Sequence, residues 1–170
     1  LVLSAAYAGI IAKPAPNVVT VAFKRDETYT PGDWLKIYTH ATLQREDRTL
    51  VSQTTSSLTT AQVQALTDQY FPAATFYSPF TAYNLTLDAP VDAVPGDYLA
   101  NADQCNRNFL IANNQVKNTR ARGILVKASE GMIANNVVEN TWLPGLQMRP
   151  EPTFWFESDW VSDVDIISNR

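Results

Sequence analysis

The sequence predicts an all-β protein: part of a right-handed parallel β-helix with 22-residue coils, preceded by a small β-barrel-like domain. The stretch FLIANNQVKNT at positions 109–119 returns as GMIANNVVENT at positions 131–141, so a constant offset of 22 relates the two copies. Short β-branched runs separated by turn residues occur along the chain, and a single segment has helical spacing. A repeat of ~20 to 30 residues built from short strands is typical of a solenoid.

The first predicted domain, residues 1–95, is small, β-rich and barrel-like, and we expect it as an insertion in the solenoid. The opening apolar run lacks a basic start and ends early, at Lys13 and Pro14, so it is not predicted to be a signal peptide and has the composition of a strand. A Pro-Gly-Asp turn before the alternating run WLKIY is typical of hairpins and barrels. Further strand patterns lie at residues 18–23, 34–38, 49–55 and 83–87. Residues 61–70 are the one predicted helix, capped by Thr59 or Thr60.

The second predicted domain, residues 96–170, consists of β-helix coils. Each coil stacks on the next at an inter-strand spacing of ~4.8 Å, with Ile111 over Ile133 and Asn114 over Asn136. The asparagines are expected to form a ladder of side-chain amides and to tolerate the left-handed backbone conformation of a turn. Gly123 is expected to supply a backbone angle that other residues resist.

A third, degenerate copy of the repeat is predicted at the end of the chain. Ile167, Ser168 and Asn169 echo residues 133–135 at an offset of 34, which implies an extra loop on that coil. Neither end of the chain resembles a natural terminus. We therefore expect a longer parent protein and association with another chain or copy through the uncapped end of the β-helix.

Composition excludes several classes of protein. The chain is 45% hydrophobic and only 18% charged, which excludes bulk disorder. A net charge of -4 gives no electrostatic footprint for nucleic acid, and no apolar run reaches the ~20 residues of a membrane-spanning helix. Cys105 and His40 are each the only residue of their type, which disfavours a metal centre. We expect no metal and no cofactor.

Two segments carry a resemblance to a known family. The run CNRNFLIANNQVKNTRARGILVKASEGMIANNVVENT at residues 105–141 and the run FWFESDWVSDVDIISN at residues 154–169 resemble the β-helix of the glycoside hydrolase family 110 α-galactosidases. The resemblance covers about residues 95–170. It implies a secreted, exo-acting enzyme that removes terminal α-galactose from an oligo- or polysaccharide with inversion and without a cofactor. The sequon Asn84-Leu85-Thr86 is a candidate glycosylation site and is consistent with secretion.

Paired carboxylates are the chemistry that glycosidic hydrolysis requires, ~6.5 to 9.5 Å apart for inversion and ~5 to 5.5 Å for retention. Glu130 and Glu151 are separated by an offset of 21, close to the repeat, and fall near the same phase of successive coils. Glu157 and Asp159 follow on the next segment. The sequence therefore predicts an acid and a base with one member from each of these pairs, unless the four acids are solvated turn residues.

Aromatic and basic side chains near these acids are the candidate sugar-binding groups. Trp142, Trp155 and Trp160 would stack on sugar rings or, alternatively, cover the outside of the solenoid. Arg120 and Arg122, if they lie in a strand, point to one face, where they would hold a carboxylate or sugar hydroxyls. Alternatively, they pair with acids of neighbouring coils and brace the turn before Gly123.

Two other functions remain open on the same fold. The first is a polysaccharide lyase or pectinase-like enzyme, which for uronates usually uses Ca²⁺ and a basic residue such as Lys127 or Arg149. The second is a non-catalytic carbohydrate-binding or structural solenoid fragment.

Overall fold

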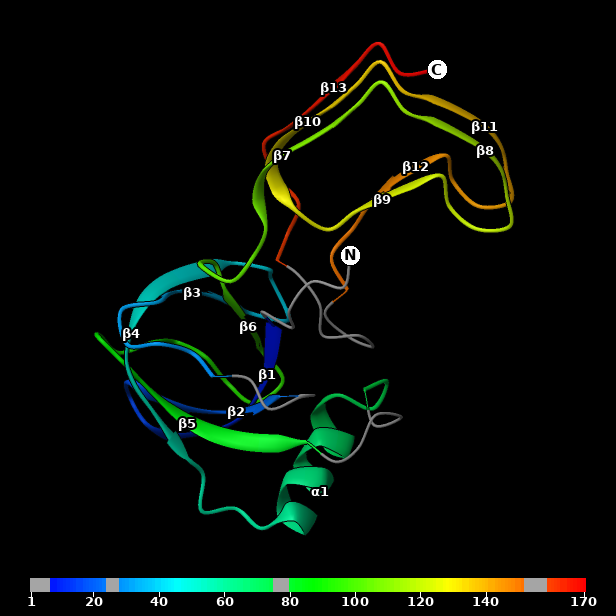
Figure 1. The fold of residues 1–170 in the computed structure, drawn as a ribbon. Helices are drawn as coiled ribbons and strands as arrows, with labels where there is room; N and C mark the ends of the chain where they lie inside the picture. The colour runs from blue at the N-terminus through cyan, green and yellow to red at the C-terminus, as the bar shows by residue number, and fades with distance from the viewer. Residues whose placement is uncertain (1–6, 24–27, 75–79, 152–158) are drawn as a thin grey trace.

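The molecule has two parts, a closed antiparallel barrel and a stack of short parallel strands (Figure 1). The computed structural model describes residues 7–23, 28–74, 80–151 and 159–170. Strands dominate both parts, so the predicted all-β class is confirmed. Among the described residues, no helix is long and apolar enough to cross a membrane.

Six antiparallel strands close the barrel in the order β1-β2-β5-β4-β3-β6. Their bounds are Tyr7–Ala15 (β1), Val18–Phe23 (β2), Trp34–Tyr38 (β3), Arg45–Thr55 (β4), Thr81–Leu87 (β5) and Tyr98–Asn101 (β6). Alternate residues of each strand point inward, so Leu35 and Ile37 of β3 are buried while Lys36 faces outward. The closed ring leaves no strand edge unpaired.

Strand β1 continues beyond the apolar run that opens the sequence. It runs through Lys13 and Pro14 to Ala15, and its register with β2 shifts between Ile10 and Ala12 and again between Ala12 and Ala15. Such irregularities let a strand accommodate a proline, which has no N–H to donate. Strand β1 therefore extends to Ala15, beyond the apolar run.

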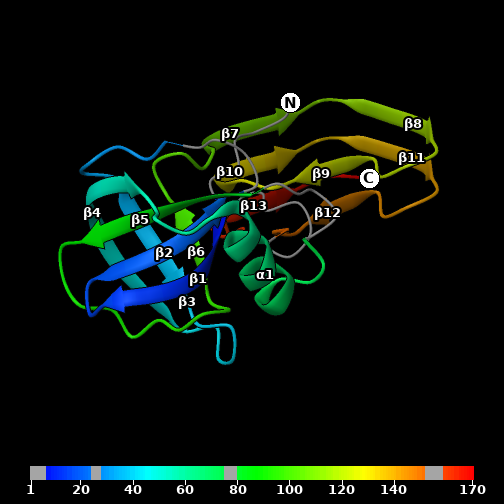
Figure 2. The same ribbon diagram turned by 90° about the horizontal axis from the view of Figure 1, so that it is seen from below.

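Helix α1, Thr60–Tyr70, packs on the outside of the barrel wall (Figure 2). Thr59 is its N-cap and forms a capping box with Gln62, in which each side chain bonds the other residue's backbone N–H. Phe71 follows the helix and lies against Gly9 of β1, where an added Cβ would come within 2.5 Å of the ring. Gly9 thus allows the C-terminal end of the helix to approach the barrel closely. The predicted helix is confirmed.

Strand β6 lies beyond the expected domain boundary at residue 95 and completes the barrel. It pairs with β1 through Tyr7–Ala100 and with β3 through Leu35–Asn101. The next strand, β7, begins at Arg107 and belongs to the parallel part. The change of architecture therefore falls between Asn101 and Arg107.

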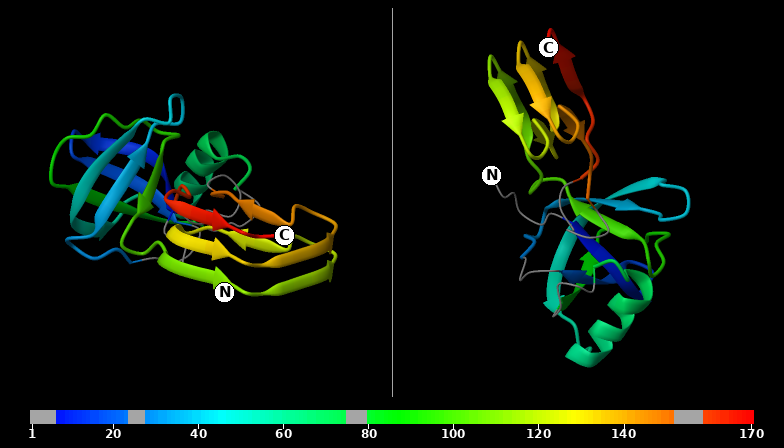
Figure 3. Two further views of the ribbon diagram at one scale, coloured as in Figure 1. Left: turned by 90° about the horizontal axis from the view of Figure 1, so that it is seen from above. Right: turned by 90° about the vertical axis from the view of Figure 1, so that its right-hand side faces the viewer.

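The parallel part consists of three small sheets whose strands lie side by side and run in the same direction (Figure 3). The sheets are β13-β10-β7, β11-β8 and β12-β9. Their strands are Arg107–Ala112 (β7), Gln115–Thr119 (β8), Ile124–Val126 (β9), Ser129–Ala134 (β10), Val137–Thr141 (β11), Leu146–Met148 (β12) and Val164–Ile167 (β13). Ile111 pairs with Ile133, Val116 with Val138 and Ile124 with Leu146, all at the offset of the sequence repeat. The predicted stacking register is confirmed.

The two asparagines of each repeat have different roles. Asn113 and Asn135 adopt the left-handed conformation with φ 59° and 55°. Asn114 and Asn136 form the ladder, in which the Asn114 Nδ2 donates to the Asn136 Oδ1 at 2.9 Å. A short polar side chain suits both tasks, because it tolerates positive φ and also spans one strand spacing.

The third copy of the repeat is present, but one residue away from the predicted alignment. Ile133 pairs with Ile166, an offset of 33 instead of 34. The Asn136 Nδ2 donates to the Asn169 Oδ1 at 2.8 Å, so Asn169 continues the ladder and Ser168, with φ 52°, takes the left-handed position. The offset of 34 is wrong because a shift of one residue would reverse every side chain between the two faces.

Gly123 is required for space and not for its backbone angle. The glycines with positive φ among the described residues are Gly32 and Gly96. A Cβ on Gly123 would lie 2.3 Å from the Val138 Cγ1 and 2.5 Å from the Gly145 carbonyl oxygen. The expectation of an unusual backbone angle is therefore wrong, and close approach of the β8–β9 turn to its neighbour replaces it.

Candidate functional site

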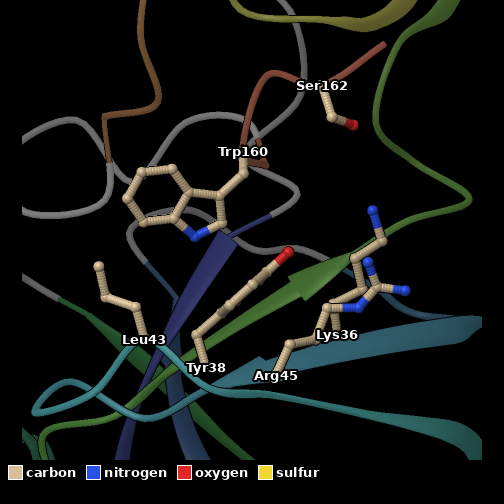
Figure 4. A pocket seen from close by; sticks show the side chains of 6 residues that line it. All are labelled: Lys36, Tyr38, Leu43, Arg45, Trp160 and Ser162. Carbon is tan, nitrogen blue, oxygen red and sulfur yellow. The ribbon is translucent and has the colours of Figure 1, made fainter.

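An open pocket of about 310 Å³ lies where the barrel meets the parallel part (Figure 4). Trp160 and Ser162 lie on the segment that leads into β13, and Tyr38, Leu43 and the two basic residues come from the β3–β4 hairpin. The pocket is lined by Lys36, Tyr38, Leu43, Arg45, Trp160 and Ser162. We call it the junction pocket. Its walls are the only part of the molecule described here where a predicted sugar-binding tryptophan faces side chains of the barrel.

Asp159 is buried behind this pocket and connects the segment before β13 to strand β3 of the barrel. Its carboxylate forms an ion pair with the Lys36 ammonium and accepts a hydrogen bond from the Tyr38 hydroxyl at 2.7 Å. The Trp160 backbone N–H also donates to the same carboxylate at 2.7 Å. The carboxylate is 5% exposed and both its oxygens are occupied. Its contacts therefore suit bracing the pocket better than exchanging protons with a substrate.

Burial of this cluster alters the acidity of its neighbours. Burial, followed by the negative charge of Asp159 and the hydrogen bond to it, raises the pKa of Tyr38 far above its ordinary value. Burial, with a smaller effect of the Asp159 charge, raises the pKa of Cys105 to about 12. Tyr38 therefore remains a neutral hydrogen-bond donor and Cys105 a thiol at neutral pH.

The basic residues around the pocket are already neutralised. Arg45 forms a bidentate ion pair with Asp47, with bonds of 2.5 and 2.6 Å. The hydrogen bond from Arg45 holds the pKa of the Asp47 carboxyl below its usual value. The Lys36 ammonium and the Arg45 guanidinium also lie 5.0 and 5.4 Å from the ring centre of Trp34. The rim is thus rich in donors without carrying net charge.

The tip of the β3–β4 hairpin places an apolar side chain at the mouth of the pocket. Leu43 has φ 55°, a left-handed conformation that costs a residue with a Cβ about 1–2 kcal/mol relative to glycine. Its N–H donates to the Thr39 carbonyl at 2.8 Å, which closes the turn. The Leu43 side chain is 54% exposed. The chain therefore holds a strained, exposed leucine opposite Trp160.

The structure brings together two of the residues that the sequence singled out, Asp159 and Trp160. The Tyr38 and Trp160 rings meet edge to face with their centres 6.2 Å apart. Glu157 and Trp155 lie outside the described residues. Trp160 is 36% exposed, so its remaining ring surface is open to solvent.

Glu130 lies next to this region on β10. Its side chain is 45% exposed and is 3.8 Å from the Arg107 guanidinium, which in turn lies 5.7 Å from the ring centre of Trp34. The Glu130 N–H donates to the Ser162 carbonyl at 3.0 Å. Gly131 pairs with Val164, the first residue of β13, so the residue equivalent to Glu130 is Asp163, directly before β13; both have positive φ, 57° and 55°. Glu130 and Asp163 therefore occupy equivalent, adjacent positions.

Glu151 follows β12 and is less accessible. Its carboxylate accepts from the Arg149 guanidinium at 2.7 Å and is 12% exposed. This ion pair already uses Arg149, one of the two basic residues considered for a lyase.

Arg120 and Arg122 lie in the β8–β9 turn and Trp142 lies in the β11–β12 turn. Both turns are at the end of the parallel part remote from the barrel (Figure 1). Arg120 and Arg122 are in the turn between β8 and β9, so the expectation that they share one face of a strand is wrong. Arg122 donates to the Gln147 side-chain oxygen, not to an acid, because strand β12 of the next repeat presents an amide at that position. Trp142 is 82% exposed. These three residues are not part of the junction pocket.

Asn84 of the predicted sequon lies in the middle of β5 in the barrel wall. Its Oδ1 accepts a hydrogen bond from the Thr20 hydroxyl of β2 at 2.8 Å, and Thr20 is 1% exposed. The side-chain amide that would carry a glycan is thus hydrogen-bonded to the neighbouring strand of the sheet.

Sequence reasoning missed the barrel half of the pocket. Lys36 and Tyr38 alternate with the buried Leu35 and Ile37 in the run WLKIY, which places both outward-facing side chains on one side of β3. That signal identifies a shared face. It does not identify the partner Asp159, which is 123 residues away from Lys36.

Comparison with known proteins indicates a distant relationship. No protein-family model matches the chain. The chain is 25% identical over 171 residues to the alpha-1,3-galactosidase A of Streptomyces avermitilis. The alignment covers 96% of this chain and 25% of the relative, so the chain spans about a quarter of that protein's length. The relationship to a galactosidase includes both the barrel and the parallel strands.

Proposed function

We propose that this chain is a segment of a glycoside hydrolase that acts on α-galactosides. The observation that carries the proposal is the alignment with the alpha-1,3-galactosidase, which runs through both parts of the molecule. In this interpretation the three parallel sheets are the faces of a right-handed parallel β-helix, whose successive coils are β7–β9, β10–β12 and one that includes β13. The barrel is a module attached to it. The constant register between the strands β7–β9 and their repeats β10–β12 supports that assignment.

We assign the proton transfers to the carboxylates of Glu130 and Asp163. Glu130 precedes Gly131 of β10 and Asp163 precedes its partner Val164 of β13, so their backbones are about one strand spacing of ~4.8 Å apart. With some divergence of the side chains, this spacing is compatible with the ~5 to 9.5 Å of paired-carboxylate hydrolases. Both are exposed, unlike Asp159 and Glu151, and so are accessible to a substrate. One would protonate the glycosidic oxygen while the other activates water or attacks the sugar.

The test uses the longest natural polypeptide that contains this chain, assayed with an aryl α-galactoside. We expect Glu130→Gln to lower kcat by about 10²- to 10⁴-fold, the range for loss of a general acid or base. Glu139→Gln is the matched control, because Glu139 is also a surface glutamate on a parallel strand but pairs with Lys117 away from the junction. A Glu130→Gln enzyme with wild-type kcat would refute the assignment of this residue. Absence of any α-galactoside hydrolysis by the wild type would refute the function.

The lyase alternative receives less support. A uronate-binding site needs a cation to receive the substrate carboxylate, whereas Lys36, Arg45 and Arg149 are each already paired with an acid. A requirement for Ca²⁺ and release of unsaturated products would favour the lyase instead.

A further inference from the structure

We propose that the junction pocket is an accessory subsite that binds a neutral sugar unit of an oligosaccharide whose scissile bond lies at Glu130. The claim that the pocket binds a neutral sugar unit rests on the pocket alone. The claim that the scissile bond lies at Glu130 rests on the proposed hydrolase function. It gives the barrel a role in substrate recognition.

The pocket has the two kinds of surface that a sugar ring requires. A pyranose presents an apolar face of C–H groups and a rim of hydroxyls. Trp160 offers an exposed aromatic surface and Leu43 an exposed aliphatic one on the facing wall, and such apolar walls with a few polar groups are typical of small-molecule sites. The Ser162 hydroxyl and the basic groups of Lys36 and Arg45 supply donors at the rim. A volume of about 310 Å³ suits a sugar unit and not a long polymer segment.

Charge pairing at the rim selects a neutral ligand. Asp159 neutralises Lys36 and Asp47 neutralises Arg45. An anionic sugar would have to compete with these carboxylates for the same cations, whereas a hydroxyl accepts from the N–H groups that remain. The pocket therefore favours a hexose over the corresponding uronic acid.

The pocket binds without cleaving because it lacks a group free to transfer a proton. Both oxygens of Asp159 are engaged, and the Tyr38 hydroxyl donates to that carboxylate. The exposed carboxylate of Glu130 is connected to the pocket through a set of contacts at the Trp34 ring. Its ring centre lies 5.0 and 5.4 Å from the cationic groups of Lys36 and Arg45, and 5.7 Å from that of Arg107, the partner of Glu130. A sugar chain bound in the pocket would thus extend along Trp34 toward Glu130.

Leu43 strengthens this interpretation. A leucine held at φ 55° and 54% exposed is unfavourable for folding on both counts, since glycine would relieve the strain and a polar residue would suit the exposure. A ligand that packs against the side chain explains why leucine is present. Leu43→Gly should therefore raise the melting temperature and weaken saccharide binding at the same time.

Direct binding is the first test, with methyl β-galactoside as the probe because an α-galactosidase does not cleave it. Ligand-observed NMR titration of the longest natural polypeptide should give saturable binding that Trp160→Ala weakens by about 10-fold, as for loss of an aromatic anchor. Trp142→Ala is the matched control and should change nothing. Methyl β-galacturonoside should bind more weakly than the neutral probe. Absence of saturable binding, unchanged binding by Trp160→Ala, or tighter binding of the uronoside would each overturn the proposal.

Because Trp160→Ala removes a ring that packs on Tyr38, its folding must be verified by thermal unfolding. Ser162→Trp provides a second variant, in which an exposed side chain is enlarged to fill the pocket; it should abolish binding of the probe.

Kinetics then separate this subsite from the catalytic one. Trp160→Ala should raise KM for an α-galactosyl oligosaccharide about 10-fold while leaving kcat and the hydrolysis of a small aryl α-galactoside within about 2-fold of wild type. An equal loss on both substrates would show that the pocket is the catalytic site and would overturn the accessory role. If the wild type hydrolyses nothing, the proposed function fails, and the NMR titration still decides whether the pocket binds a saccharide.

Discussion

The barrel and the parallel part are stabilised in different ways. The barrel encloses a large buried cluster contributed by all six strands, with residues such as Ile10, Val21, Leu35 and Leu85 fully buried. In the parallel part the described buried cluster is Ile124, Val126 and Ile133, with partly buried residues around it. In the closed barrel each strand is hydrogen-bonded along both edges. Among the residues that the structure describes, β7 and β13 are each paired with β10 along one edge only.

This difference means that repetition partly replaces a core in the parallel part. Each repeat reuses the same positions, so Ile111, Ile133 and Ile166 form one apolar column, and Asn114, Asn136 and Asn169 form one polar column. Ile166 at the end of its column is 48% exposed. Each layer is therefore stabilised mainly by the adjacent layer, as repeats in a stack are.

The same substitution in the two parts is the strongest test of this contrast. Ile10 of β1 and Ile133 of β10 are both fully buried. We expect Ile10→Ala to cost about 4 kcal/mol, because the closed barrel cannot collapse around the cavity. Ile133→Ala should cost about 2–3 kcal/mol, because its neighbours lie near solvent and relax more easily. Chemical denaturation, monitored by hydrogen exchange, measures the free energy of unfolding of both variants. Equal losses of free energy would contradict the proposed difference between the two parts.

Breaking the contact between the two parts should have the next largest effect. Asp159→Asn leaves Lys36 without its carboxylate in a site where the two side chains are 5% and 12% exposed, and we expect a loss of about 3 kcal/mol. The surface pair Lys117–Glu139 is the control, and Glu139→Gln should cost less than about 1 kcal/mol. A double-mutant cycle with Lys36→Met isolates the pair energy. If Asp159→Asn is as mild as the control, Asp159 does not hold the parts together.

Removing one member of the asparagine ladder should have the smallest of these effects. Asn136 is fully buried and its side chain bonds Asn114, Asn169 and the Ile111 carbonyl. Asn136→Ala is expected to cost about 2 kcal/mol. Asn140→Ala loses one bond, to Asn118 on the exposed turn, and should cost about 0.5–1 kcal/mol. The melting temperatures of both variants test this prediction. If both variants lower the melting temperature by a similar small amount, the ladder contributes little to stability.

Prediction from the sequence succeeded for β2 and β3 and for the two copies related by the exact 22-residue repeat. Residues 18–23 and 34–38 form β2 and β3 with the expected bounds, and the repeat at an offset of 22 predicted which residues stack. The prediction failed for β13, where one copy has few identical residues and an alignment shifted by one position looked equally good. Strand β4 extends back to Arg45, because cross-strand pairing with β3 stabilises the charged run REDR that had no strand pattern of its own.

Only part of the candidate site could be predicted from the sequence. Acids beside tryptophans marked Asp159 and Trp160, but Lys36, Tyr38 and Arg45 carry no signal that distinguishes them from any outward-facing strand residue. Asp159 was predicted to take part in catalysis, and in the structure its carboxylate contacts Lys36 and Tyr38 of the barrel, which the sequence did not indicate. The charge state of a site depends on which opposite charges are nearby, and those lie far apart in the chain.

By itself, the sequence determined the strand-rich class, the period of the repeat and the identity of the residues that stack, because these follow from local alternation and from one unit pairing with its own copy. Only the tertiary structure decided that β6 closes the barrel, that Gly123 needs space and that Lys36 meets Asp159. Those features depend on contacts between segments whose separation in the chain leaves no local pattern, and their geometry exists only after the chain has packed.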